Sequence, residues 1–433
     1  MLKIKTDFTI YDIVIMLIIL FQGSNHLKVF PSPFYKYIIC LLFVLLVIKY
    51  IKEKKRLKIN FVILVWVLLL YAFSIIVSLD KRLVVPMIFF IIEIYAFKMY
   101  INLFETKQEL FERILKIILV SATILSVIGF IQIIGYKLNI NFLHDYKWMG
   151  IIPNYYGYLA EGRYYSIYDE PAHLCTILGA GLFSSYYFMK KDRKYMIPMI
   201  IIAIFGFFTG SVITYVALLA FVLYILFYNL RIENEKLSKT KIIVFCLILV
   251  AIAILVAIKP SLIINSIEKI NNFFSDNADS AYLQNGTTFA LKSNYLIAIN
   301  KIKDGYILGT GIFTHEFYYY SYIDRIYTSH YQQYLNYSDA ASIFIRILSE
   351  FGVLSSLIYI AIIVYIYKAC RKNNYMNLFY IMMFITQGMR LGDYTWFFNC
   401  LPIVIIFSDF KNDKLIILKN KIVNKVQAFL GGN

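Results

Sequence analysis

The sequence predicts an all-α integral membrane protein with about 12 transmembrane helices and two large extracytoplasmic loops. Three observations support this prediction. Hydrophobic residues make up 60% of the 433 residues and charged residues only 16%, whereas about 25% of the residues in a soluble domain are charged. The apolar residues fall in long runs. The basic residues crowd into every second gap between those runs, which is the positive-inside pattern of a multi-pass membrane protein.

Most of the apolar runs approach the length of about 20 residues with which a helix crosses the hydrocarbon core. The first run is short, and two long stretches must each divide into two spans at a tight turn. Glycine and small polar residues supply such turns, at Thr209-Gly210-Ser211 and at Arg390-Leu391-Gly392-Asp393. The predicted spans are 8–22, 34–51, 60–79, 83–101, 112–135, 170–189, 195–209, 211–230, 241–259, 340–367, 375–389 and 394–410.

The basic clusters determine the predicted topology. An even number of spans, with both termini in the cytoplasm, places every cluster on the inner side. The tail 411–433 alternates lysines with apolar residues at helical spacing, so we expect an amphipathic segment on the cytoplasmic membrane surface. Topology and anionic lipid account for the net charge of +17, and we expect no nucleic-acid partner. The clusters are Lys49–Lys58, Lys98–Lys116, Lys190–Lys194, Arg231–Lys241, Lys368–Lys372 and Lys411–Lys425.

This topology makes residues 1–433 a single polytopic membrane domain with two substantial outer loops, at 136–169 and 260–339. Function concentrates in loops that a rigid scaffold holds in place, so these two loops are the candidate functional segments. The five cysteines are scattered and show no paired, metal-type spacing. We therefore expect neither a metal ion nor another cofactor.

The first outer loop leads through Arg163 to Glu170 and Pro171, where a span begins. Acidic residues in the first turn and proline at the first helical positions are typical of a helix start. That structural interpretation leaves Arg163 unexplained. An arginine just before a helix N-terminus forms a natural anion site, so Arg163 is a candidate for phosphate binding or catalysis.

Tyrosines are dense in both outer loops, and those that we select as sugar contacts are Tyr164, Tyr165, Tyr319 and Tyr331. An aromatic belt at the membrane interface is the simpler interpretation. A sugar-binding face is the alternative, because tyrosine combines an apolar ring with a hydroxyl group that forms hydrogen bonds.

Arg346 and Glu350 lie one helical turn apart within the span 340–367, so they can pair on one face. Ionisable residues within spans are costly and usually face a polar cavity. The pair is either a structural ion pair between helices or the wall of an outward-facing active site. Glu93 and Arg390 allow the same two interpretations.

The sequence contains no Walker loop, no GxSxG and no HExxH motif. Four features instead resemble O-antigen or capsule polymerases of the Wzy type, in the wider group that includes O-antigen ligases. The many spans with two dominant outer loops resemble the family's architecture. Three short stretches resemble its motifs: Arg163 to Glu170-Pro171 before a span, Leu308-Gly309-Thr310-Gly311, and Ile347-Leu348-Ser349-Glu350-Phe351-Gly352-Val353-Leu354.

Three positions depart from the family pattern. Ligases and many relatives carry a histidine where this chain has residues near Ala341, and the arginine upstream of the glycine stretch is replaced by Lys292. The Ser-Arg pair often found in the family reads Ser211-Val212 here. The missing histidine favours a polymerase over a ligase. A ligase and a flippase for lipid-linked oligosaccharide stay open as alternatives.

The resemblance implies that a growing glycan on polyprenyl diphosphate is transferred to a lipid-linked repeat unit at the outer face of a bacterial cytoplasmic membrane. Positive charge is needed near the leaving diphosphate and a base near the attacking hydroxyl. We assign Arg163 and Arg325 to the diphosphate, with Lys292 and Arg346 as second choices. Asp339 or His330 is the expected base, and Glu170 is expected to orient its neighbours. A flippase and a chain-length regulator are the further partners that this chemistry suggests, besides the lipid bilayer.

Overall fold

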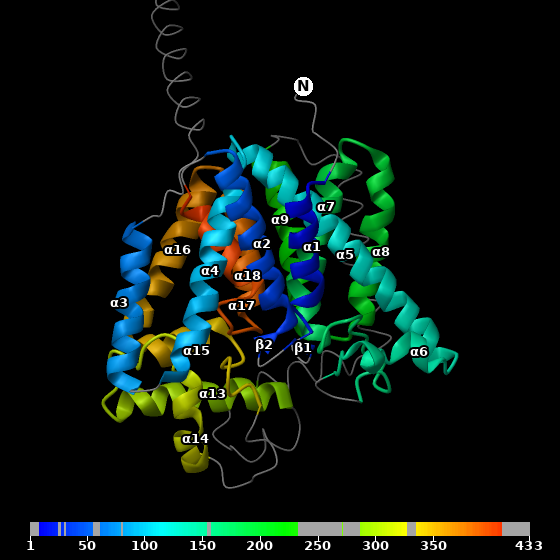
Figure 1. Ribbon diagram of the computed structural model, residues 1–433. Helices are drawn as coiled ribbons and strands as arrows, with labels where there is room; N and C mark the ends of the chain where they lie inside the picture. The colour runs from blue at the N-terminus through cyan, green and yellow to red at the C-terminus, as the bar shows by residue number, and fades with distance from the viewer. Residues whose placement is uncertain are drawn as a thin grey trace, which may run out of the picture.

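The computed structural model describes residues 8–24, 27–29, 32–54, 61–78, 81–153, 157–232, 271, 286–326 and 335–408. These residues form a bundle of helices, which confirms the predicted all-α class (Figure 1). A single antiparallel ladder within the described ranges pairs β1 (Lys28–Val29) with β2 (Ser32–Pro33). The predicted span 241–259 and the tail 411–433 lie outside the described residues, as does much of the outer loop 260–339.

The described helices of the bundle occupy the predicted apolar ranges. The predicted span 340–367 corresponds to a helical segment from Ile343 to Arg371, which has a break at Gly352, whose φ is +53°, and a single 3₁₀ turn there. The helices are α1 (Ile10–Phe21), α2 (Phe34–Lys52), α3 (Phe61–Ser78), α4 (Val84–Ile101), α5 (Lys107–Lys137), α7 (Cys175–Met189), α8 (Met196–Phe208), α9 (Val212–Phe227), α15 (Ile343–Phe351), α16 (Ser355–Arg371), α17 (Tyr375–Gly388) and α18 (Phe397–Ile406).

Shorter elements and two outer helices complete the described chain. Helices α13 (Gly286–Lys303) and α14 (His315–Ile326) lie beneath one end of the bundle, and α13 runs across it (Figure 1). The short elements are α6 (Asn141–His144), η1 (Lys81–Leu83), η2 (Tyr146–Met149), η3 (Pro171–Leu174), η4 (Arg193–Tyr195), η5 (Tyr228–Ile232) and η7 (Gly352–Leu354).

Five helical segments within the described residues are long and apolar enough to cross a membrane: Phe34–Lys52, Val84–Ile101, Lys107–Lys137, Val212–Leu230 and Ile343–Arg371. The longest of them, α5, begins at a capped N-terminus, where the Thr106 hydroxyl oxygen accepts a hydrogen bond from the backbone N–H of Glu109. At 31 residues, α5 is about 46 Å long and exceeds the ~30 Å hydrocarbon core. The total number of spans stays a prediction.

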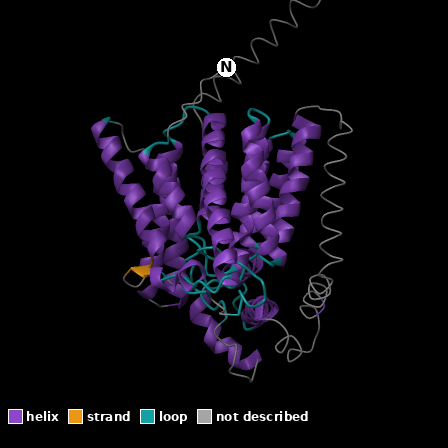
Figure 2. Ribbon diagram, turned by 90° about the vertical axis from the view of Figure 1, so that its right-hand side faces the viewer, coloured by secondary structure: helices purple, strands orange, loops and turns teal. Residues whose placement is uncertain are grey.

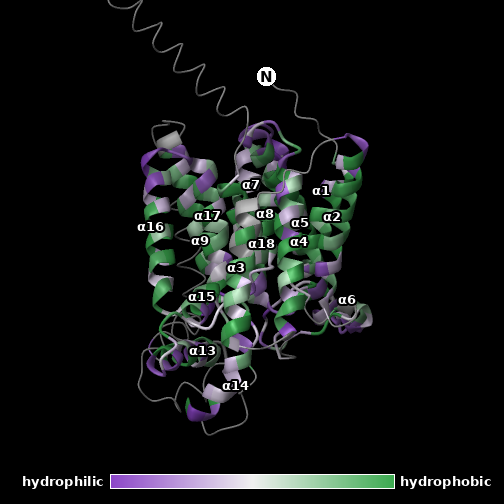
Figure 3. Cartoon of the chain, turned by 60° about the vertical axis from the view of Figure 1, so that its left-hand side comes forward, coloured by the Kyte–Doolittle hydropathy of each residue, from purple (hydrophilic) through white to green (hydrophobic). Residues whose placement is uncertain are grey.

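The outer surface of the bundle is apolar, as expected of helices that face lipid. On α16, Leu357, Ile360 and Ile363 recur at three-residue spacing, and each is more than half exposed. In water this stripe would be an aggregation hazard, whereas in a bilayer it contacts acyl chains. The upright helices are largely hydrophobic along their lengths, and hydrophilic residues gather at the two ends of the bundle (Figure 3).

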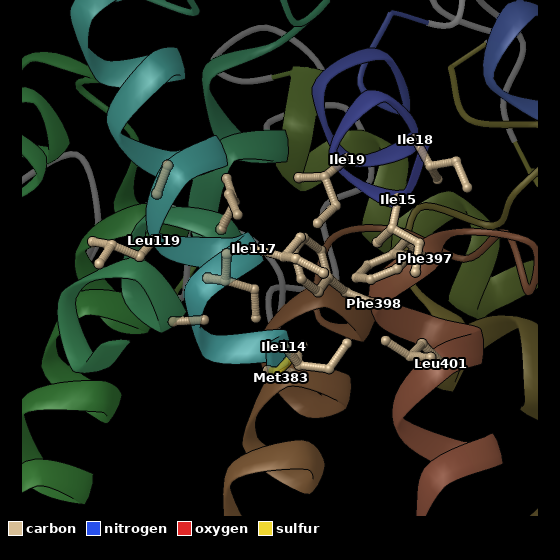
Figure 4. Close-up of a cluster of buried hydrophobic side chains, with 14 of the residues drawn as sticks. Ile15, Ile18, Ile19, Ile114, Ile117, Leu119, Met383, Phe397, Phe398 and Leu401 are labelled. Carbon is tan, nitrogen blue, oxygen red and sulfur yellow. The ribbon is translucent and has the colours of Figure 1, made fainter. Parts of the chain in front are cut away.

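The interior is packed from side chains of helices that are distant in sequence. Figure 4 shows Ile15 of α1 beside Phe397 of α18, in a buried cluster that also includes Ile117 of α5 and Met383 of α17. Close approach of helices also requires glycine, because a Cβ built at Gly129 of α5 would overlap the ring of Phe205 in α8. Such close packing makes the bundle a rigid support for its loops.

The two ends of the bundle differ in charge. Basic residues occupy the last turns of α2 (Lys49, Lys52), α4 (Lys98) and α16 (Lys368, Arg371). These helix ends lie together at the top of Figure 1, at the opposite end from α13 and α14. Loops from several parts of the chain gather at that second end (Figure 2), which we call the loop end.

Candidate functional site

The turn between α17 and α18, residues 389–396, forms the centre of the candidate site. Its geometry is fixed by Asp393, whose Oδ1 atom accepts hydrogen bonds from the backbone N–H and the hydroxyl of Thr395, both at 2.9 Å. A Cβ built at Gly392 would overlap the backbone carbonyl of Asp339. Glycine is therefore required at this position for the turn to approach the segment that precedes α15.

Arg390, at the start of this turn, forms a buried ion pair with Glu170, which directly follows the first outer loop. The guanidinium Nε and Nη2 atoms donate to the two carboxylate oxygens at 3.1 and 2.6 Å. Both side chains are about 5% exposed. This two-point geometry fixes the orientation of the carboxylate. Glu170 immediately precedes η3, with Pro171 at its first position, as the helix-start interpretation predicts.

Arg346 and Glu350 form a second buried pair on α15. Arg346 Nε donates to Glu350 Oε1 at 2.9 Å, which confirms the predicted pairing one turn apart. The Tyr394 hydroxyl donates to the other carboxylate oxygen at 2.8 Å. The guanidinium also lies over the rings of Phe313 and Tyr394, at 5.2 and 4.8 Å from their centroids.

The central turn joins the two pairs into one cluster. Arg346 Nη1 donates to the carbonyl oxygen of Gly392 at 3.2 Å, two residues beyond Arg390. Asp339 Oδ2 accepts from the Gly392 N–H at 3.4 Å, and its Oδ1 accepts from the Ala341 N–H at 3.2 Å. The fold thus brings Glu170, Arg346 and Asp339, three of the predicted site residues, to one place at the loop end.

Helix α15 is polar on its inner face and apolar on its outer face. Arg346, Ser349 and Glu350 are buried, whereas Ile345 and Leu348 are partly exposed. These two residues line an apolar groove of about 470 Å³, bounded also by Tyr295 of α13, Tyr359 of α16 and Ile385 of α17. The helix therefore separates a charged cluster from an apolar groove.

The glycine-rich stretch before α14 packs against the end of α15. The N–H groups of Thr310 and Gly311 both donate to the carbonyl oxygen of Glu350, at 3.0 and 2.9 Å. Gly309 has a φ of +79°, and a Cβ at this position would overlap the same carbonyl. The stretch therefore holds the end of α15, where Glu350 lies, in place.

A further buried network connects α13, α14 and α15. Of these three helices, α13 and α14 lie outside the candidate membrane spans. Lys301 Nζ donates to the hydroxyl oxygens of Thr310 and Ser349 at 2.7 and 3.0 Å. His315 contacts Ser349 through Nδ1 at 2.8 Å and Asn294 Oδ1 through Nε2 at 2.7 Å. Because an amide oxygen only accepts, Nε2 carries the proton and Nδ1 accepts from Ser349.

Burial controls the protonation of this network. Desolvation lowers the pKa of Lys301 from 10.5 to about 7. The nearby negative charge of Glu350 acts in the opposite direction but is the smaller effect. Desolvation also lowers the pKa of His315 well below 6.5, and the positive charges of Lys301 and Arg346 act in the same direction. His315 is therefore neutral near pH 7, in agreement with its hydrogen bonds.

The other predicted basic residues belong to other segments, although the charge of Arg163 reaches Glu170. Arg163 lies over the Tyr158 ring, 4.7 Å from its centroid, and its Nη1 is 3.6 Å from a carboxylate oxygen of Glu161. Its side chain is 27% exposed. Arg325, on α14, pairs with Asp304 at 2.7 Å. Lys292 is buried on α13.

The predicted tyrosine contacts that the structure describes are buried. Tyr164 packs beside Phe208, and the Tyr165 N–H donates to the side chain of Gln132 at 3.0 Å. Tyr319 lies at the centre of a small cluster between α13 and α14. His330 and Tyr331 lie outside the described residues. The assigned roles of these residues stay predictions.

Several residues of the cluster were not selected from the sequence. The sequence allows two interpretations for Arg390, a structural ion pair or the wall of an active site, but does not identify its partner, because Glu170 is 220 positions away. Lys301 and His315 carry no motif. His173 is three residues after Glu170, and this spacing in a helix start is the one local signal that could have identified it.

Comparisons of the chain with models of protein families, with curated proteins and with solved structures find no match. The functional conclusion therefore depends on the membrane-type bundle and on the chemistry of the cluster at its loop end.

Proposed function

We propose that this chain is a polysaccharide polymerase of a bacterial cytoplasmic membrane, which joins polyprenyl-diphosphate-linked oligosaccharide repeat units on the outer face. The observation that carries the proposal is the cluster at the loop end. Two arginine–carboxylate pairs, Arg390–Glu170 and Arg346–Glu350, meet at one rigid turn. On the other side of α15 lies an apolar groove. A lipid-linked sugar has the same combination of polar and apolar parts.

The apolar groove suits the lipid part of such a substrate. Its walls come from α13, α15, α16 and α17, and Phe344, Leu348 and Ile362 contribute aliphatic and aromatic surface. A polyprenyl chain gains free energy wherever its CH₂ and methyl groups contact apolar side chains. The groove would guide the chain while the diphosphate and the sugars stay at the loop end.

Arg163 is the strongest candidate for the diphosphate. Its carboxylate contact, Glu161, is distant at 3.6 Å and about half exposed. Arg346 and Arg390 are instead engaged by buried carboxylates at 2.9 and 2.6 Å. A diphosphate would have to displace those carboxylates, at the large cost of a broken buried pair. Arg325 stays the other first choice for the diphosphate, and Lys292 stays a second choice.

The charge distribution supports the proposed topology. The loop end, which holds the cluster, would face outward, and the end with the basic turns of α2, α4 and α16 would face the cytoplasm. About 12 spans with both termini inside agree with this arrangement. A flippase would deliver the substrate to the outer face, and a chain-length regulator would act on the product.

Mass spectrometry of polyprenyl-linked glycans in cells that lack this chain tests the proposal, together with a gel of the surface polysaccharide. We expect single repeat units on lipid and loss of long polymer. Full-length polymer on lipid would indicate a ligase, and single units trapped on the cytoplasmic face a flippase. An unchanged profile would contradict every glycan function. Arg163→Ala tests the first diphosphate assignment, and full polymerisation by this variant would exclude it.

A further inference from the structure

His173 lies against the buried pair at the centre of the site. Its Nε2 atom is 3.6 Å from Glu170 Oε2, and its ring meets the Trp396 ring edge-on, with 5.2 Å between centroids. Its Nδ1 atom is buried and has no hydrogen-bond partner among the described residues. A carboxylate on this side of the ring favours the tautomer with its N–H at Nε2, which leaves the Nδ1 lone pair free to accept.

Other buried polar atoms close to this pair also lack partners within the described part of the chain. They are Nη1 of Arg390 and both amide atoms of Gln387, one turn earlier on α17. Buried polar groups in folded proteins are nearly always hydrogen-bonded. Free atoms on His173 and Arg390, the two residues that face Glu170, indicate a place where a polar group of a substrate binds.

The charge of this place indicates which group binds. The positive charge of Arg390 is matched by Glu170 at 2.6 Å, so the pair is neutral overall. A neutral group with both a donor and an acceptor fits the free atoms of His173, Gln387 and Arg390 better than an anion does. A sugar hydroxyl has these properties.

We propose that His173 Nδ1 accepts the proton of the attacking sugar hydroxyl, while Glu170, itself fixed by Arg390, faces the opposite ring nitrogen. This inference rests on the proposed polymerase function. The hydroxyl oxygen forms a bond to the anomeric carbon of the donor, and the bond from this carbon to the diphosphate oxygen breaks. Polyprenyl diphosphate leaves with the electron pair of that bond, and the hydroxyl proton passes to His173.

The other bases of the cluster are already engaged. Both ring nitrogens of His315 are hydrogen-bonded, as are both carboxylate oxygens of Asp339 and of Glu350. His173 differs from these three groups because its acceptor atom is free. Glu170 then stabilises the imidazolium that forms, as a carboxylate beside a catalytic histidine does. Because His173 is 3% exposed, the surrounding segments must part when the substrate enters.

The test uses full-length protein in liposomes, with repeat units on polyprenyl diphosphate extracted from cells that lack the chain. His173→Gln keeps a polar side chain but cannot take up a proton, and His173→Ala leaves space for imidazole from solution. We expect kcat to fall about 10²–10⁴-fold in both variants, with KM unchanged. Added imidazole should restore part of the rate of His173→Ala only. His144→Gln, at a histidine of the first outer loop, is the matched control and should retain the wild-type rate.

The outcomes separate this inference from the proposed function. A wild-type rate in His173→Gln would overturn the inference but not the proposed function. The same holds if the substitutions raise KM instead of lowering kcat, or if imidazole does not restore the rate of His173→Ala. Each variant is compared on protein that elutes as a single species of wild-type size. If wild-type protein itself elongates no glycan, the proposed function fails and the inference fails with it.

Discussion

At the scale of single residues, the site contains buried charged side chains, each of which is paired with an opposite charge or with hydrogen-bond donors. Arg390 and Arg346 are each held by a carboxylate, and Asp339 is held by backbone N–H groups. Matched charges define a geometry without making the site strongly positive. Local spacing made the Arg346–Glu350 pair predictable, because positions one turn apart on a helix face each other. The Arg390–Glu170 pair was not predictable, because only the tertiary fold joins the two loops.

The Arg390–Glu170 pair provides the first prediction. Glu170→Gln leaves a buried guanidinium without its counter-charge, which costs about 3–5 kcal/mol of stability. We expect a clear drop in the thermal transition of the purified protein and loss of polymerisation. Glu161→Gln, at the more exposed Arg163 pair, should change the stability by less than about 1 kcal/mol. Equal effects of the two substitutions would contradict a special role for the buried pair.

At the scale of elements, α15 is positioned by the segments that pack against its end. The N–H groups of Thr310 and Gly311 contact the Glu350 carbonyl, and Lys301 and His315 contact Ser349. The glycines at 309 and 311 were a weak signal in the sequence, since glycine is common in turns. Their role becomes clear only when the partner backbone is known.

Two glycines of this loop give a matched pair of variants. Gly309 and Gly305 both have positive φ, at +79° and +100°, but a Cβ would overlap Glu350 only at Gly309. Gly305→Ala should cost about 1–2 kcal/mol for the left-handed backbone alone. Gly309→Ala should cost more and should abolish polymerisation, because Glu350 must move. Thermal melting and the polysaccharide gel measure the two effects, and similar behaviour of both variants would argue against the contact.

The buried Lys301 predicts a dependence of stability on pH. Its pKa is about 7 in the folded chain against 10.5 unfolded, so between these values the unfolded chain binds more protons. The free energy of unfolding therefore rises with pH between about 7 and 10.5. This stabilisation is lost as the pH falls back to about 7, below which Lys301 is protonated in the folded chain as well. Facing Lys301 are Glu350, His315 and the Tyr318 ring.

Lys301→Met should weaken this dependence between pH 6.5 and 9, measured as the thermal transition of purified protein. Lys303→Met, at an exposed lysine of the same helix, is the control and should leave the dependence intact. An unchanged slope in Lys301→Met would mean that Lys301 is not the group that titrates.

At the scale of the whole molecule, composition and charge pattern were sufficient to predict a helical membrane protein. Apolar runs mark helices because a bilayer forces each backbone group to bond within its own segment. The ends of α3 and α8 agree with the predicted ranges to within one residue. The break at Gly352 was missed, because apolar residues continue through it and only the positive φ marks the change in direction.

The topology can be measured with single cysteines introduced into a variant that lacks the five native ones. Gly305→Cys, at the loop end, should react with a membrane-impermeant maleimide in intact cells. Lys372→Cys, after the basic end of α16, should react only after the cells are opened. Labelling of position 372 in intact cells would reverse the proposed orientation and place the cluster on the wrong side for a polymerase.

The most direct test of the account is a reconstituted reaction. Purified wild-type chain in liposomes is incubated with polyprenyl-diphosphate-linked repeat units, and the lipid-linked products are measured by mass spectrometry. We predict a ladder of masses that increase by one repeat unit, with one free polyprenyl diphosphate released for each bond formed. Unchanged masses, from protein that is folded and inserted, would contradict the proposed polymerase.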